Sequence, residues 1–150
     1  MSINENLKPH VIIDFENDEQ FTKHGVSTYL NYWNLKQFEK QHFSCCVDTT
    51  GIKDIDIMFG TKQAMIIAKF IKKMKKQKQQ YLKYTILVMP NVILCNLLDI
   101  ILQITKPCAT LYIVNTREQA DKLYDTINRG NQIEINAYLI INEINYIKPK

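Results

Sequence analysis

The chain has 150 residues and a formal net charge of +4 at pH 7; 46% of its residues are hydrophobic and 23% are charged. This length and composition predict one globular domain and argue against a disordered or fibrous protein. Lysine supplies almost all of the positive charge, since Arg117 and Arg129 are the only arginines. That balance argues against nucleic acid as a partner, because arginine makes the bidentate contacts to phosphate and guanine.

The polar start of the chain lacks the apolar core of a signal peptide. The longest apolar run, residues 92–104, is interrupted by Asn96, Asp99 and Gln103 and is shorter than the ~18 residues of a membrane span. We therefore expect a soluble, intracellular (cytoplasmic) protein with no transmembrane segment. Within it we expect a flexible N-terminus at 1–9, a single domain at 10–147 and a C-terminal tail at 148–150.

Apolar segments suited to strands alternate with segments whose apolar residues recur at helical spacing. In chain order we expect a strand at 10–15, a helix at 21–41 that is clearest from Ser27 onward, a strand at 43–48, a helix at 60–79, a strand at 84–89, a helix at 92–105, a strand at 109–114, a helix at 116–129 and a strand at 133–141. The alternation predicts right-handed crossovers and an α/β fold, with a largely parallel five-stranded sheet and four helices.

The stretch from residue 43 to 60 is the candidate site. Asp48, Thr49, Thr50 and Gly51 follow the second predicted strand, and Asp56 precedes the long helix. The carboxyl ends of strands are where α/β proteins place their sites, so polar residues at this point indicate function.

This stretch resembles the STAS domains, the fold of bacterial anti-sigma-factor antagonists and of the cytoplasmic part of sulfate transporters. In that family a strand ending in Asp and a Gly-aliphatic pair precede Ile-Asp-Ser-Ser-Gly-Leu at a helix start, and residues 47–52 and 55–56 are similar in order and spacing. Residues 87–92 and 113–120 resemble later strand-to-helix junctions of the family. The resemblance spans about residues 10 to 128 and implies a STAS-like fold and a protein-binding module with a phosphorylatable serine.

Two alignments of the serine motif remain open. In the first, the serine pair falls on Ile57 and Met58, which cannot accept a phosphoryl group, so the switch has been lost. In the second, residues 48–51 align with Asp-Ser-Ser-Gly, which makes Thr49 or Thr50 a phosphoacceptor and leaves a long insertion before the helix. We favour the first alignment and therefore expect that the phosphorylatable serine switch is absent.

A more distant resemblance is to the CRAL-TRIO lipid-transfer domain, through residues 48–51, Tyr81 and residues 105–107. It implies a lipid ligand, although the chain has no evident gating helix and no segment after the last strand to close a lipid pocket. The 22 Ile, 13 Asn and 17 Lys residues are typical of an AT-rich genome. A third interpretation is therefore an accessory or virion-associated protein of a large DNA virus.

Lysines crowd one side of the predicted 60–79 helix. Lys69, Lys72, Lys73 and Lys76 are candidate contacts for an acidic partner or an anionic surface, and a solvated face is the alternative. The hypothesis drawn from the sequence is a non-catalytic STAS-like module that binds a protein partner or self-associates.

An enzyme would use Asp14 and Asp48 at neighbouring strand ends, with Lys83 or Lys106, to hold Mg²⁺ or transfer a phosphoryl group. The sequence has no glycine-rich phosphate loop, nucleophile elbow or suitably spaced His/Cys pair. We therefore expect no catalysis, cofactor or metal.

The four cysteines lack metal-ligand spacing and are expected as buried, reduced thiols. Cys45 and Cys46, being neighbours on a strand, should face opposite sides of the sheet.

Overall fold

The computed structural model describes residues 2–7, 10–15, 26–52, 55–130 and 139–141. Along this part of the chain lie β1 (Ser2–Leu7), β2 (His10–Asp14), α2 (Ser27–Glu39), β3 (Phe43–Asp48), α3 (Ile57–Lys75), β4 (Leu82–Val88), α4 (Val92–Ile104), β5 (Thr110–Val114), α5 (Arg117–Asn128) and β6 (Leu139–Ile141).

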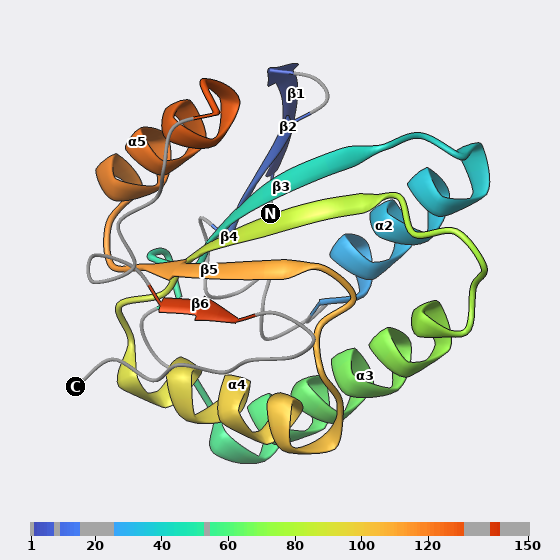
Figure 1. Ribbon diagram of the computed structural model, residues 1–150. Helices are drawn as coiled ribbons and strands as arrows, with labels where there is room; N and C mark the ends of the chain where they lie inside the picture. The colour runs from blue at the N-terminus through green and yellow to red at the C-terminus, as the bar shows by residue number, and fades with distance from the viewer. Residues whose placement is uncertain (1, 8–9, 16–25, 53–54, 131–138, 142–150) are drawn as a thin grey trace.

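The strands form one sheet in the order in which they occur along the chain. β2, β3, β4 and β5 are parallel, and β1 and β6 are antiparallel to their neighbours at the two edges. Right-handed crossovers that all advance in the same direction place their helices on one face. Figure 1 accordingly shows α2, α3 and α4 on one side of the sheet and α5 on the other.

The α/β class and the four helices agree with the sequence, but the expected largely parallel five-stranded sheet is wrong in its strands: the described sheet has six, of which four are parallel. Only four strands of the described chain are parallel, because β6 pairs antiparallel with β5. Alternating apolar residues predict a strand but not its direction, since the side-chain period is the same in both kinds of sheet. The rest of that predicted strand, 133–138, lies outside the described residues. So does the first part, 21–25, of the helix predicted at 21–41. β1 lies in a segment for which the sequence predicts no strand.

Local capping explains where the helices start. α3 begins at Ile57, three residues before the predicted start, because the Asp56 side chain caps it by accepting a hydrogen bond from Phe59 N at 3.1 Å. Asn91 caps α4 through the backbone N–H groups of its first turn. A capping box formed by Thr116 and Gln119 opens α5.

Apolar side chains form a core on each face of the sheet. The larger core joins the sheet to α2, α3 and α4, and the smaller one joins it to α5. Cys45 lies in the larger core and Cys46 in the smaller, which confirms that they face opposite sides. Burial raises their pKa values, to about 11 for Cys45 and about 12 for Cys46, so both stay protonated thiols near neutral pH.

The larger core contains a cavity of about 160 Å³ between the sheet and the layer of α2, α3 and α4. Protein interiors are normally close-packed. Apolar side chains that line such a space lack part of the dispersion contacts that a filled core would give them.

A polar and aromatic cluster lies under α5 on the other face. His10 is 3% exposed, its Nδ1 lies 2.6 Å from Ser44 Oγ, and its ring stacks on Tyr124 with the ring centroids 4.1 Å apart. Burial, together with the positive charge of Arg117, lowers the pKa of His10 from 6.5 to about 4. His10 is therefore neutral in the folded protein at physiological pH.

We predict that acid destabilises the protein through His10. The folded-state pKa lies below the unfolded one, so stability is complete above pH 6.5 and falls as the pH drops through about 4. At ~1.4 kcal/mol per pKa unit, the loss is roughly 3 kcal/mol. Urea unfolding of the wild type and of His10→Gln at several pH values measures it. Equal pH dependence in the two proteins would contradict this account.

Candidate functional site

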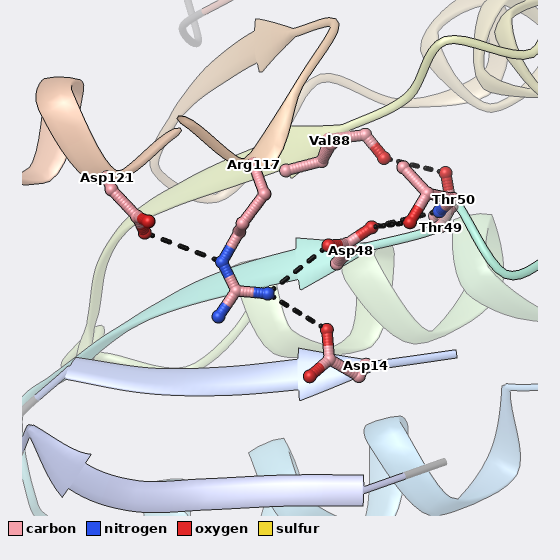
Figure 2. Close-up of polar contacts among 7 residues, drawn as sticks. All are labelled: Asp14, Asp48, Thr49, Thr50, Val88, Arg117 and Asp121. Carbon is pink, nitrogen blue, oxygen red and sulfur yellow. Dashed lines mark hydrogen bonds and ion pairs between the residues drawn. The ribbon is translucent and has the colours of Figure 1, made fainter. Parts of the chain in front are cut away.

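Two carboxylates meet at the carboxyl edge of the sheet. Asp14 ends β2 and Asp48 ends β3, and the two residues pair in the parallel register. Arg117 Nη1 lies 3.0 Å from Asp14 Oδ1 and 3.2 Å from Asp48 Oδ2, so one guanidinium nitrogen bridges both (Figure 2). The prediction that Asp14 and Asp48 lie at neighbouring strand ends is therefore confirmed. The Arg117 guanidinium lies between them.

The fold positions Arg117 directly. It is the first residue of α5, which starts at the same edge of the sheet right after β5, and the capping box fixes that first turn. Asp121 Oδ1, one turn later, forms an ion pair with Arg117 Nε at 3.4 Å, although Nε makes no hydrogen bond within the described part of the chain. Partial burial acts to lower the pKa of Arg117, but Cys46 and the neighbouring carboxylates raise it above its ordinary value, so the side chain stays charged.

Neither of the lysines that an enzyme would use with these carboxylates, Lys83 or Lys106, lies beside them. Lys83 lies near the amino end of β4, and Lys106 lies between α4 and β5, at the opposite edge of the sheet from the strand ends. The arrangement imagined for phosphoryl transfer is therefore not formed. No group of three or more His, Cys, Asp or Glu side chains is placed to hold a metal ion among the residues that the structure describes.

Sequence reasoning missed Arg117 as the partner of Asp14 and Asp48. The signal was present: an arginine at the first position of a helix that follows a parallel strand must lie at the carboxyl edge of the sheet. The sequence does not tell on which face α5 packs, and that choice decides which strand ends the guanidinium can reach.

The turn after β3 treats its two threonines differently (Figure 2). Thr49 is 5% exposed, and its hydroxyl donates to Val88 O at 2.7 Å. Thr50 is exposed, and its backbone N–H and hydroxyl donate to Asp48 Oδ1 at 2.9 and 2.7 Å. Gly51, the last residue of the candidate motif, is half-buried. Of the two candidate phosphoacceptors, only Thr50 is accessible to another protein.

Apolar side chains are exposed where α3 and α4 begin. Ile57 and Met58 are 66% and 74% exposed on the first turn of α3, and Val92 is 72% exposed at the start of α4. The two helices approach closely at Gly60, because a Cβ there would lie 2.7 Å from Leu97 Cδ1. The residues aligned with the serine pair therefore lie on the surface, near a second exposed apolar helix end.

Along the outer face of α3, exposed apolar side chains near the start of the helix are followed by lysines near its end. Met58, Met65, Lys69, Lys72 and Lys76 follow one another at steps of seven, four, three and four residues, which places them on one face. Ile66 and Lys73 flank this row. We name these exposed residues the outer stripe of α3: Met58, Met65, Ile66, Lys69, Lys72, Lys73 and Lys76. All of its members are exposed.

His10 and Ser44 form a second contact that the sequence did not predict. An oxygen 2.6 Å from an imidazole nitrogen is the distance expected between a nucleophile and its base. Both side chains are buried, however, and His10 is stacked between Tyr84 and Tyr124. A substrate has no access to this pair as it stands, so we assign it to the packing of α5.

Comparisons with known proteins give no name to this arrangement. No protein-family model, curated protein or solved structure matches the chain, so the two family resemblances rest on the quoted motifs alone. None of the helices in the described ranges is both long enough and apolar enough to cross a membrane.

We predict that Arg117→Gln destabilises the fold. It removes the guanidinium that bridges Asp14 and Asp48, and for partly buried groups the loss should be roughly 2 kcal/mol in the free energy of unfolding. Arg129→Gln is the matched control, because Arg129 is exposed at the end of α5. Chemical unfolding measures both.

A second readout separates charge from packing. The Arg117 charge lowers the pKa of His10, so an NMR titration of His10 should move to higher pH in Arg117→Gln and stay in place in Arg129→Gln. If both variants match the wild type in stability and titration, Arg117 does not hold this edge together.

Proposed function

We propose that the protein is a non-catalytic, STAS-like interaction module that binds an acidic protein partner through the outer stripe of α3. The observation that carries the proposal is the two-part character of this stripe. Its first half is apolar, with Met58, Met65 and Ile66 between 40% and 74% exposed, and its second half carries Lys69, Lys72, Lys73 and Lys76.

The apolar half supplies the anchor. Large apolar side chains gathered on a surface are typical of protein interfaces, and methionine adapts to irregular partner surfaces. Ile57, Val92 and Ile93 are further exposed apolar side chains in the first turns of α3 and α4. Ordinary burial in the fold does not explain these residues, since the inner face of α3 packs through others such as Ala64 and Ala68.

The lysine half sets the charge of the partner. α3 contains no acidic residue, so its lysines have no ion pairs within the helix. The helix dipole favours cations in the last turn, which accounts for Lys72 and Lys73 but not for Lys69, a turn earlier. Two copies of the chain meeting through this stripe would bring like charges together. The charge pattern therefore favours a different, acidic protein over self-association.

The STAS resemblance fits this surface in its first alignment. Ile57 and Met58 stand at the positions of the family's serine pair, so we infer a permanent contact in place of one controlled by phosphorylation. In the second alignment Thr50 is the accessible hydroxyl. We place this module inside the cell, in the cytoplasm or in a virion.

The competing lipid-binding function has one observation in its favour, the cavity in the larger core. At about 160 Å³ it takes roughly six to eight non-hydrogen atoms, by comparison with a cavity of ~150 Å³ that holds benzene. A whole membrane lipid does not fit in that volume. The cavity is therefore considered separately below.

Affinity capture from cells that naturally express the protein tests the proposal. We predict that Met58→Asp/Ile66→Asp and Lys69→Glu/Lys73→Glu each lower recovery of the partner by about tenfold or more, as expected from the loss of ~1.4 kcal/mol or more. Raising the salt concentration should release the partner from the wild type, because exposed charges are screened.

Control variants carry changes of the same kind on other helices. Leu35→Asp/Phe38→Asp removes exposed apolar side chains from α2, and Lys122→Glu reverses an exposed charge on α5. These variants should capture the partner as the wild type does. If the stripe variants capture it equally well, or if the wild type captures no protein and stays monomeric, the proposal fails.

A further inference from the structure

We propose that the cavity under α2, α3 and α4 is a binding site for a small, uncharged, apolar molecule that carries one oxygen. The inference is independent of the proposed function, since the cavity lies on the inner side of α3 and the outer stripe on the other. Either can fail while the other holds.

The walls of the cavity determine the kind of ligand. Side chains from the sheet and from all three helices of that face line it, among them Val47, Leu87, Trp33, Ile67, Leu98 and Ile101. Among the described residues, none of the lining side chains is charged. An ionised ligand would lose its hydration without gaining a partner, so the site selects neutral molecules.

One corner of the cavity carries hydroxyl groups that are weakly paired. Tyr29 and Thr85 both line the wall; the Tyr29 hydroxyl lies 3.9 Å from Cys45 Sγ, and the Thr85 hydroxyl lies 3.5 Å from the same sulfur. Tyr29 and Thr85 also hydrogen-bond to each other, and sulfur is a poor hydrogen-bond partner, so the hydroxyl proton directed at Cys45 stays available to an oxygen atom. Thr49 also lines the cavity, but its hydroxyl is already bonded to Val88 O.

Trp33 also lines the cavity and carries a donor. It is 4% exposed, and its Nε1 has no hydrogen-bond partner among the residues that the structure describes. Buried N–H groups without a partner are rare and costly. Its ring packs edge-on against Phe70 with 5.2 Å between the ring centroids, which holds the indole beside the cavity. Apolar walls with unsatisfied donors match a ligand that is hydrocarbon except for one acceptor, such as a short aliphatic alcohol, ether or ketone.

The chain supplies its own reporter for this site, because Trp33 is the only tryptophan. We expect titration of the full chain with 1-hexanol or benzene to change the Trp33 fluorescence saturably, with one molecule bound by calorimetry. Sodium hexanoate at neutral pH should give no saturable change. Binding that does not saturate, or hexanoate binding as well as hexanol, would overturn the proposal.

A pair of neighbouring residues on α3 locates the binding. Ile67 lines the cavity, whereas Ile66 does not and is 47% exposed. Ile67→Phe fills part of the cavity and should weaken both probes by about tenfold or more, while Ile66→Phe should leave them unchanged. Equal affinities in the two variants would place the probes elsewhere on the protein and refute the site.

Tyr29→Phe tests the hydroxyl corner and does not depend on how Ile67→Phe folds. Removal of one hydrogen bond should lower the affinity for 1-hexanol by about threefold to tenfold and leave the affinity for benzene unchanged. A change of the same size for both probes would mean that Tyr29 contributes only shape, and the assignment of an oxygen-bearing ligand would be wrong.

Discussion

The right-handed, one-directional winding of four parallel strands is the constraint on which the rest of this structure depends. β2, β3, β4 and β5 lie side by side in chain order, so each crossover helix packs on the same face as the one before. The strand ends all point to one edge, where α3, α4 and α5 begin. α5 is the exception that packs on the other face, and this allows Arg117 to reach back across the strand ends to Asp14 and Asp48.

The same winding determines how the carboxyl edge of the sheet is filled. Ligands of α/β proteins bind where the strand order reverses and the helices part. The order of β2 to β5 does not reverse, so neighbouring crossovers stay packed against each other, as at Gly60 and Leu97. An arginine occupies the space between the two aspartates. The polar residues of this edge bond to one another or cap local structure. Asp48 accepts a hydrogen bond from the Thr50 hydroxyl, and Asp56 caps the start of α3.

Much of the fold could be predicted from the residues, because short-range rules determine it. The strand at 43–48 and the helix at 116–129 follow from apolar patterns; the strand is found at the predicted bounds and the helix within one residue of them. Long-range choices were out of reach. The direction of β6 depends on how the chain returns to the sheet, and the face chosen by α5 depends on which apolar surface is left uncovered. The contact of His10 with Ser44 and the bridge through Arg117 both follow from that face. The cavity is also invisible to the sequence, because it depends on how the helices fail to fill the space above the sheet.

α3 is therefore the element with two roles to explain: its inner side closes over a cavity, and its outer stripe joins apolar side chains to lysines. Site-specific photo-crosslinking tests the outer role most directly. A photoreactive phenylalanine at Met65, in the middle of the stripe, should form a covalent adduct with one acidic protein in cells, and the same residue at Leu35 on α2 should not. Adducts of equal yield at both positions, or no adduct at Met65, would contradict the account.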